Sequence, residues 1–345
     1  MLRLPPFDFY LPTSLAEAAD MLASSGPTAR LVAGGTDLWP NMKRRHQQAE
    51  TVISLMRIPE LRAVGNGDGD GDLTLGATVS LHEVAADATV RSRYPALATA
   101  VDSISSLPLR HMGTLGGNVC VDTRCTYYNQ TEDWRRSISY CLKEAGETCW
   151  VAPGSKSCLA HSASDSAPML CALGARIRLV STAGERELAL RDLYQNDGID
   201  YLVKQPEEIV TAIEIPAAAR AGRCRTAFWK LRRRGSIDFA VLSSSVALWL
   251  TADSTVERAE IYLGAVSSRP LRADAACDLL LGKRLEPELL REAAQLARKP
   301  ATPFDNTDFQ AQWRGQMVAR YTEAALREAA GLEAERLAPK HGLGA

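Results

Sequence analysis

A cluster of cysteines in one irregular segment is the feature that most restricts how this chain can fold. Six of the eight cysteines lie between residues 120 and 171. Four of them are spaced 16, 8 and 9 residues apart within a polar stretch, residues 122–163, that lacks regular hydrophobic periodicity: Cys125, Cys141, Cys149 and Cys158. A segment with so little capacity to form its own core is a natural candidate for stabilisation by a metal.

Four thiolates suit two kinds of metal site, tetrahedral zinc or an iron–sulfur cluster. The segment contains no CxxC pair, which argues against a zinc ribbon. Cys120 is a competing fifth candidate, although a strand residue directly after a glycine loop usually points into a core. The remaining cysteines are expected to be small buried hydrophobic residues: Cys171, Cys224 and Cys277. The residues alone therefore predict a metal site and leave the metal open.

The composition is that of an ordinary globular protein. Apolar residues make up 46% of the chain, and the formal net charge is −1, so no general attraction to nucleic acid or to an anionic membrane is expected. A basic run at residues 220–234 is interpreted as a solvated strand edge or a partner contact. No secretory signal is found, and the longest apolar run, residues 239–250, is too short to span a bilayer. We therefore predict a cytoplasmic protein, in which persistent disulfides are rare.

The hydrophobic pattern begins with a β-α-β unit, in which Ser14 and Glu17 form a capping box before a helix at 15–22. Its strands are predicted at 29–33 and 51–55. Residues 65–72 are expected to form a flexible hairpin turn. Further helices are predicted after the Ser80–Glu83 capping box and at 95–104, 166–173, 273–281, 287–298 and 309–330, and further strands at 176–181, 209–216, 227–233, 239–250 and 259–266.

Two glycine-rich loops carry the next informative pattern. LVAGGTDL at residues 31–38 continues an apolar strand into paired glycines, and GTLGGN at residues 113–118 is expected to be a loop that leads into a strand. Paired glycines let backbone N–H groups approach an anion and form a phosphate-binding nest. Neither loop is a P-loop or a GxGxxG motif, and each alone is also compatible with a plain turn. Two such loops together can enclose a diphosphate, which suits a dinucleotide such as FAD.

These loops, together with Ser164-Asp165 before an apolar helix and WKLRRRGSIDFA at residues 229–240, resemble the FAD-binding subunits of the molybdenum hydroxylases. That family includes the xanthine and carbon monoxide dehydrogenases. The resemblance implies an α+β fold, with an FAD-binding domain of the PCMH or vanillyl-alcohol-oxidase type and an α+β C-terminal domain like that of CO dehydrogenase flavoproteins. The expected parts are two α/β FAD-binding subdomains at 1–58 and 59–218, an insertion at about 122–163, the C-terminal domain at 223–332 and a tail at 333–345.

The insertion closely resembles that of the β subunit of 4-hydroxybenzoyl-CoA reductase. This resemblance implies that Cys125, Cys141, Cys149 and Cys158 hold a [4Fe–4S] cluster and leaves Cys120 out. It also implies the residues expected around FAD: Leu31, Val32, Ala33, Gly34, Gly35, Thr36, Asp37 and Leu38 in the first loop, and Gly113, Thr114, Leu115, Gly116, Gly117 and Asn118 in the second.

Four further FAD contacts are implied by the same resemblance. Asp165 is expected at the ribose or adenosine part, and Lys230 near the isoalloxazine or ribityl chain. Ile104 and Leu188 are expected to be apolar contacts. The sequence LRHMG replaces the IRN of many relatives before the second loop, so the roles of His111 and Met112 stay open.

The resemblance predicts an electron relay that has no substrate acid or base of its own. Its expected partners are a molybdenum-cofactor large subunit, a [2Fe–2S] small subunit, together a heterohexamer of two trimers, and a ferredoxin-like donor. The predicted reaction of the complex is reductive dehydroxylation of 4-hydroxybenzoyl-CoA to benzoyl-CoA. The alternative within the family is a dehydrogenase that oxidises an aldehyde or an N-heterocycle. The alternative of another class is a zinc-stapled, nucleotide-binding scaffold.

Overall fold

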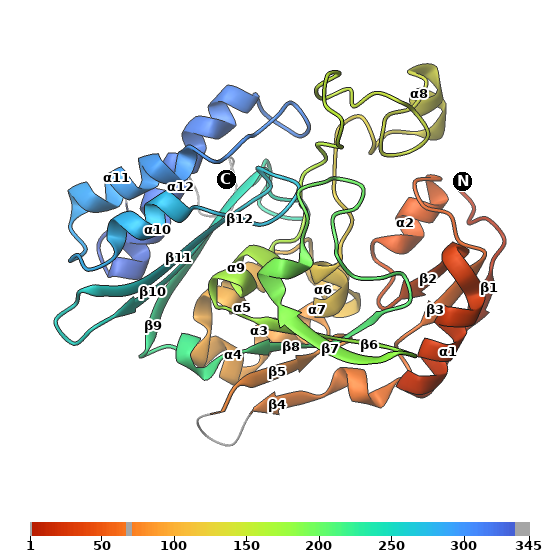
Figure 1. Ribbon diagram of the computed structural model, residues 1–345, viewed down its shortest axis with the longest axis horizontal. Coiled ribbons are helices and arrows are strands. Elements are labelled where there is room, and N and C mark those ends of the chain that lie inside the picture. The colour runs from red at the N-terminus through yellow and green to blue at the C-terminus, as the bar shows by residue number, and fades with distance from the viewer. Residues whose placement is uncertain (1, 67–70, 335–345) are drawn as a thin grey trace.

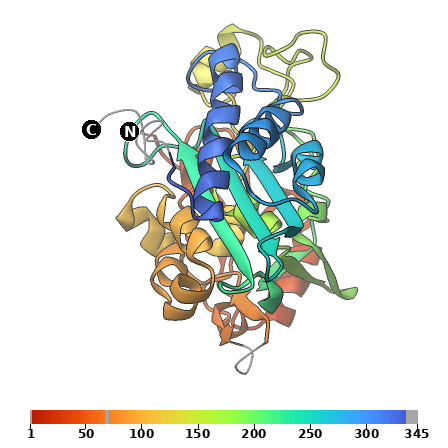
Figure 2. The same cartoon turned by 90° about the vertical axis from the view of Figure 1, so that its left-hand side faces the viewer.

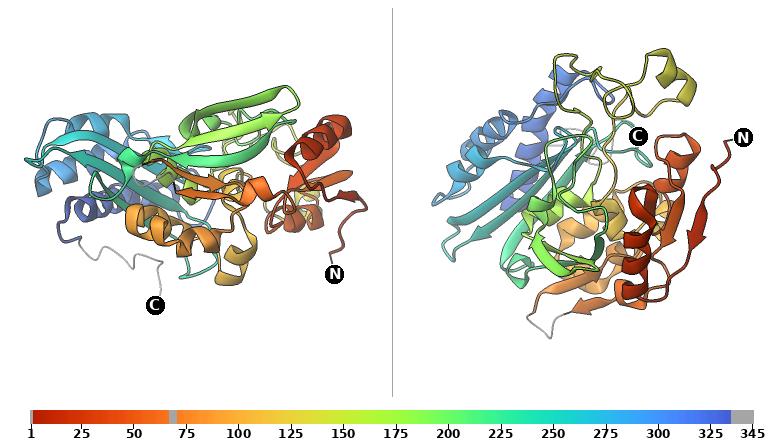
Figure 3. Two further views of the ribbon diagram at one scale, coloured as in Figure 1. Left: turned by 90° about the horizontal axis from the view of Figure 1, so that it is seen from below. Right: turned by 45° about the vertical axis from the view of Figure 1, so that its right-hand side comes forward.

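The computed structural model describes residues 2–66 and 71–334. In this part of the chain the strands form three sheets that follow one another along the sequence (Figure 1). Seen from below, the N-terminal unit and the C-terminal domain lie at opposite ends, with the middle sheet between them (Figure 3). The centre of the predicted hairpin turn, residues 67–70, and the tail from residue 335 onward lie outside the described residues. None of the described helices is long and apolar enough to cross a membrane.

The first sheet is a small parallel unit, as its sequence pattern predicts. Its strand order is β1-β3-β2, and its elements are β1 (Asp8–Tyr10), α1 (Leu15–Ser25), β2 (Ala29–Val32), α2 (Leu38–Lys43) and β3 (Thr51–Ser54). Ser14 Oγ accepts the N–H of Glu17 at 3.2 Å and so caps α1. The predicted capping box is only half formed, because the Glu17 carboxylate accepts the N–H of Thr13 instead of that of Ser14.

The second sheet is antiparallel and has the order β4-β5-β8-β6-β7. Its strands are β4 (Val64–Asn66), β5 (Leu73–Gly76), β6 (Arg176–Ser181), β7 (Gly184–Ala189) and β8 (Ile209–Ile215). The helices between them are α3 (Leu81–Ala86), α4 (Ala88–Arg93), α5 (Pro95–Asp102), α6 (Leu107–Met112), α7 (Leu115–Val119) and α9 (Ser166–Ala172). The capping box of Ser80 and Glu83 is confirmed by both of its bonds. Strand β7 was not predicted, because this edge strand is largely exposed and shows no apolar alternation.

The third sheet forms the C-terminal domain, with the antiparallel order β12-β11-β10-β9. Its elements are β9 (Cys224–Leu231), β10 (Leu242–Leu250), β11 (Val256–Gly264), β12 (Leu271–Arg272), α10 (Asp274–Leu280), α11 (Pro287–Arg298) and α12 (Ala311–Ala330). Helices α10–α12 cover one face (Figure 2), while α5 and α9 pack against the other. Burial on both faces explains the long apolar run of β10. Ser244 within it is satisfied by a 3.2 Å bond to Thr322 of α12.

The local prediction for the second glycine loop was wrong. The second glycine loop leads into helix α7 instead of a strand, because Thr114 Oγ1 accepts the N–H of Gly117 at 3.2 Å and caps the helix. Asp165 does not cap α9 with its side chain. Ser164 does so instead, since its Oγ accepts the N–H of Ala167 at 3.0 Å. The carboxylate of Asp165 is thereby free for another role.

The predicted insertion is irregular, as expected, and its described helix is α8 (Glu132–Ser137). It rises at the top of Figure 1 between the N-terminal unit and the C-terminal domain. On the N-terminal side, Tyr128 Oη donates to the carbonyl of His46 at 2.7 Å. On the C-terminal side, the N–H of Thr126 donates to the carbonyl of Asn306, whose Nδ2 donates to the carbonyl of Leu159. Hydrogen bonds to both neighbours therefore hold the insertion in place.

Candidate functional site

The structure brings the two glycine loops into backbone contact. A Cβ atom on Gly34 would lie 1.6 Å from the carbonyl oxygen of Met112, so only glycine permits this approach. A Cβ atom on Gly113 would lie 3.4 Å from Thr36 Oγ1, across the same contact. The loops therefore form one site, although helices α2–α6 and strands β3–β5 separate them along the chain.

The first loop presents a row of free backbone donors. In the described part of the chain, the N–H groups of residues 34–38 have no protein acceptor. Gly35 has a φ of +71°, a left-handed conformation in which successive N–H groups can turn toward one point. The loop is half-buried except at Thr36, which is exposed. This arrangement is a nest suited to an anion.

The second loop contributes in a different way from the one predicted. The N–H groups of Gly113 and of residues 115–118 already donate to protein acceptors, so they are not available to a phosphate. Its available group is the Asn118 side chain. The Oδ1 atom of Asn118 accepts from Ser164 Oγ at 2.9 Å and from Ser166 Oγ at 2.7 Å, which fixes the amide plane. Its NH2 group is left to donate to a ligand.

Asp165 and Lys230 form a buried ion pair beside these loops. Lys230 Nζ lies 2.6 Å from Asp165 Oδ2 and also donates to the carbonyl of Ser103 at 3.1 Å. Asp165 is 3% and Lys230 is 1% exposed, and this burial raises the pKa of the aspartate and lowers the pKa of the lysine. Asp165 Oδ1 is buried without a partner among the described residues. An unpaired buried carboxylate oxygen is what a ligand hydroxyl would satisfy.

The basic run was interpreted as a solvated strand edge or a partner contact. Strand β9 is indeed the edge of its sheet, but Lys230 and Arg232 within the run are buried. Both donate to the carbonyl of Ser103, just after α5. The solvated interpretation is therefore wrong for these two side chains, because they satisfy a buried acceptor next to helix α5. Ile104 lies in the central apolar core, and Leu188 packs half-buried against it.

The four insertion cysteines line a single cavity. Each is at most 7% exposed, and the cavity between the lining residues has a volume of about 10 Å³. The lining also includes Tyr128, Lys143 and Trp150. Cys120 is not part of the lining, and Cys171, Cys224 and Cys277 are buried elsewhere, as predicted for small hydrophobic residues. The structure thus brings together the four cysteines that the resemblance selected.

Backbone N–H groups point at the sulfur atoms of this cavity. Cys125 accepts from the N–H groups of Tyr127 and Tyr128, and the N–H of Ala160 lies 3.5 Å from Cys158 Sγ. Cys141 accepts similarly from Lys143. Burial raises the pKa of Cys125 to about 11 and that of Cys158 to about 12. The thiols of Cys125 and Cys158 are therefore protonated at neutral pH when free, whereas the N–H donors favour the thiolates that a bound metal would require.

Among the described residues, the four sulfurs are not arranged as a formed metal site. Throughout residues 2–66 and 71–334, no three His, Cys, Asp or Glu side chains form a group that could hold a metal ion. The four thiols line one cavity, and four thiolates are the ligand set of either a tetrahedral zinc ion or a [4Fe–4S] cluster.

An ion pair that the sequence did not predict connects the two sites. Arg124, the residue before Cys125, pairs with Asp37 of the first glycine loop, and its guanidinium lies 5.0 Å from the centre of the Phe239 ring. Burial raises the pKa of Asp37, although Arg124 opposes this shift. Asp37 and Arg124 are 87 residues apart, so no local pattern could have paired them.

Two family models match nearly the whole chain. One describes the FAD binding domain in molybdopterin dehydrogenase and covers residues 5–218. The chain belongs to this family. The other describes the CO dehydrogenase flavoprotein C-terminal domain and covers residues 226–329. The predicted α+β fold class and the predicted oxidoreductase subunit are confirmed, and the family supports FAD as the cofactor.

Similar proteins are subunits of several oxidoreductases. The carbon monoxide dehydrogenase medium chain of Afipia carboxidovorans is 28% identical over 94% of this chain and 96% of its own length. The aldehyde oxidoreductase FAD-binding subunit PaoB of Escherichia coli is 30% identical over 76% of this chain and 81% of its own length. A solved carbon monoxide dehydrogenase structure from Hydrogenophaga pseudoflava matches with a TM-score of 0.79 at 25% identity, covering 95% of this chain and 99% of that one.

Two buried histidines make the stability of the fold sensitive to acid. Burial lowers the pKa values of His46 and His161 from 6.5 to about 4. The unfolded chain therefore binds up to two more protons than the folded chain between these values, and stability falls as the pH drops through this window. Each histidine contributes up to about 3 kcal/mol. We expect the thermal unfolding midpoint to fall between pH 7 and pH 5, and to fall less in the His46→Gln/His161→Gln double variant; a midpoint unchanged by pH would contradict this.

Proposed function

We propose that this chain is the FAD-carrying electron-transfer subunit of a molybdenum hydroxylase-type complex and that its insertion holds a [4Fe–4S] cluster. The observation that carries the proposal is the single cavity lined by Cys125, Cys141, Cys149 and Cys158, with backbone N–H groups directed at the sulfurs. Such N–H···S bonds stabilise thiolates and help to set the potential of a cluster.

The proposed FAD site uses three groups of this chain. The free N–H groups of residues 34–38 would bind the diphosphate, and the fixed amide of Asn118 would donate to the same region. The unpaired Oδ1 of Asp165 would accept from a hydroxyl of the ribose or adenosine part, with Lys230 holding the other oxygen. When bound, FAD exchanges one or two electrons, whereas an iron–sulfur cluster exchanges one.

The Arg124–Asp37 ion pair supports an arrangement in which the proposed FAD and the proposed cluster are held at a fixed distance from each other. Arg124 is bonded through the chain to Cys125 and through its side chain to the glycine loop. The pair is mostly buried, with 10% of the Arg124 side chain exposed, so water screens it weakly. We infer that it keeps the cluster-bearing insertion in register with the FAD loop. A rigid separation between carriers is what an electron relay needs.

We infer the partners from the relatives. A carbon monoxide dehydrogenase medium chain and an aldehyde oxidoreductase FAD-binding subunit are parts of larger assemblies by name. We propose that this chain joins a molybdenum-cofactor large subunit and a [2Fe–2S] small subunit, in a heterohexamer of two trimers, and receives electrons from a ferredoxin-like donor in the cytoplasm. The proposed domain limits are 1–58, 59–218 with the insertion at 122–163, and 223–332.

Two substrate classes are proposed. The cysteine pattern of the insertion favours 4-hydroxybenzoyl-CoA, reduced to benzoyl-CoA by the partner molybdenum subunit. The names of the similar proteins, including a glyceraldehyde dehydrogenase medium chain and a caffeine dehydrogenase subunit, favour oxidation of an aldehyde or an N-heterocycle. Assays of the co-purified complex separate these two: benzoyl-CoA formation with a reduced low-potential donor supports the first, and aldehyde-driven bleaching of the flavin supports the second.

Anaerobic purification with iron, zinc and flavin analysis tests the proposed cofactors. We expect roughly four irons and one FAD per chain, because a cluster held by four thiolates contains four irons. One zinc without flavin would instead indicate the zinc-stapled scaffold and overturn the proposal. One FAD without iron would retain the flavoprotein and remove the cluster.

A further inference from the structure

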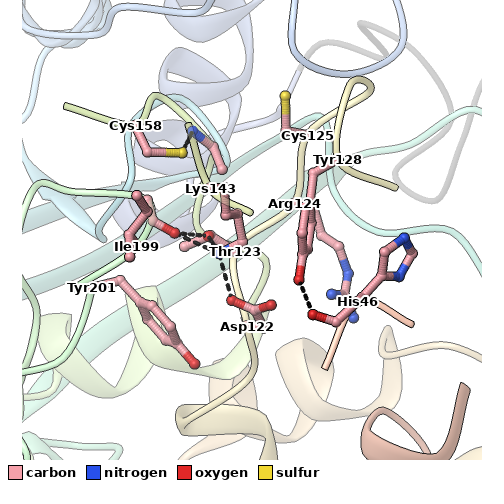
Figure 4. Close-up of polar contacts among 12 residues, drawn as sticks. His46, Asp122, Thr123, Arg124, Cys125, Tyr128, Lys143, Cys158, Ile199 and Tyr201 are labelled. Atoms are coloured by element: carbon pink, nitrogen blue, oxygen red, sulfur yellow. Dashed lines mark hydrogen bonds and ion pairs between the residues drawn. The ribbon is translucent and has the colours of Figure 1, made fainter. Parts of the chain in front are cut away.

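A buried lysine forms part of the wall of the four-cysteine cavity. Lys143 lines this cavity, and only 6% of its side chain is exposed. Its ammonium group donates to Asp122 Oδ1 and Thr123 Oγ1, each at 2.7 Å, and to the carbonyl of Gly198 at 2.5 Å (Figure 4). Three acceptors thus satisfy all three of its donors and hold the charge in one position.

Aromatic rings further confine this ammonium group. Its Nζ lies 5.1 Å from the centre of the Tyr128 ring and 5.7 Å from that of the Tyr201 ring. Tyr201 is itself held by a 3.0 Å bond to the carbonyl of Cys120, and Tyr128 by its bond to His46. The position of the charge is therefore determined by residues from well-separated parts of the chain.

The ion pair between Lys143 and Asp122 is oriented relative to the cavity. Lys143 lines the cavity, whereas Asp122 does not, and the charge of Lys143 opposes the rise that burial causes in the pKa of the Cys158 thiol. The Asp122 side chain is only 8% exposed, so solvent screens neither charge effectively. A buried ion pair is also weak evidence for a stabilising role, because desolvation offsets most of its attraction. Its orientation points to an electrostatic role instead.

We propose that Lys143 raises the reduction potential of the cluster and that Asp122 moderates this effect. The inference rests on the proposed function, namely that the insertion holds a [4Fe–4S] cluster. Reduction adds one electron, supplied by a one-electron donor, to a centre that four thiolates already make negative. A fixed positive charge beside the sulfurs stabilises the reduced form more than the oxidised form. Lys143 is thus a positioning and tuning residue that does not itself bind iron.

Two substitutions with opposite expected signs test this role. Lys143→Met removes the positive charge and should lower the cluster potential. Asp122→Asn leaves the lysine without its counter-charge and should raise the potential. The measurement is an anaerobic redox titration of the intact complex, with the reduced cluster followed by electron paramagnetic resonance and dithionite as reductant. We expect each variant to change the one-electron equilibrium constant at least tenfold, which corresponds to about 59 mV.

Matched variants show whether a change in the cluster potential comes from the lost charge or from a disturbed structure. Lys143→Arg keeps the charge and should keep most of the potential, while Lys156→Met removes an exposed lysine of the same insertion and should leave the potential unchanged. If Lys143→Met loses its iron, Asp122→Asn and Lys143→Arg decide the question. An unchanged or lowered potential in Asp122→Asn would overturn the inference. Wild-type protein without iron would overturn the proposed cluster itself, so the two failures are distinguishable.

Discussion

Replacing Cys141 with serine should remove the cluster from this subunit while it keeps FAD. Cys141 is 7% exposed and lines the cavity with the other three cysteines. A serine hydroxyl is a poor ligand for iron compared with a thiolate, and clusters of this type need four such ligands. We expect iron to fall from roughly four per chain to below about one. The FAD content should be largely retained, because the glycine loops lie outside the insertion. Iron and flavin analysis of the anaerobically purified variant provides the measurement.

Two other cysteines serve as controls for this prediction. Cys277→Ser removes a buried thiol from the C-terminal core, which lies away from the cavity, and should keep its iron. Cys120→Ser addresses the fifth cysteine, which does not line the cavity, and should also keep its iron. Normal iron content in Cys141→Ser, or iron loss in Cys120→Ser, would show that the proposed ligand set is wrong.

Replacing Gly34 with alanine should abolish tight FAD binding. The added Cβ would lie 1.6 Å from the carbonyl oxygen of Met112, a backbone atom that cannot rotate away. The two glycine loops must then separate, and the row of free N–H groups at residues 34–38 loses its geometry. Over-packing of this kind typically costs about 1–3 kcal/mol in stability. We expect at least a tenfold loss of FAD affinity, measured by the recovery of flavin fluorescence on dilution, and a lower unfolding midpoint.

Gly154 offers a matched control for the same substitution. A Cβ at Gly154 would meet no atom within 4 Å, and its φ does not lie in the left-handed region. Gly154→Ala should therefore leave both the FAD affinity and the unfolding midpoint unchanged. If Gly34→Ala bound FAD as tightly as Gly154→Ala does, the contact between the two loops would have no part in the flavin site.

Local patterns in the sequence predicted much of the fold. The capping box of Ser80 and Glu83 and the bond between Ser14 and Glu17 involve residues three positions apart, so the sequence alone contains the information. The strands of the C-terminal sheet were evident as apolar runs, because that sheet is covered on both faces. The error at the second glycine loop was also local in origin, because the Thr114 side chain caps a helix where a strand was predicted.

The candidate site was predicted only in part. The resemblance selected the two glycine loops and the four cysteines, and the structure brings each set together. The resemblance did not indicate that most N–H groups of the second loop already donate to protein acceptors. It also did not indicate that the side chain of Asn118 is the group that this loop presents to a ligand. It did not indicate Arg124 or Lys143 either. Their partners, Asp37 and Asp122, lie 87 and 21 residues away, and no periodicity relates residues at such separations.

The sequence by itself indicated the family and the α+β class, because the motifs that resemble known members are short stretches of contiguous residues. The four cysteines as cluster ligands stay a prediction of that resemblance. Only the tertiary structure decided which groups are free to act. The buried Asp165–Lys230 pair joins residues 65 positions apart. The Lys143 ammonium is held in place by Asp122 and by the rings of Tyr128 and Tyr201. Solvent screens these buried charges less than exposed ones, so they act more strongly on neighbouring groups of the site.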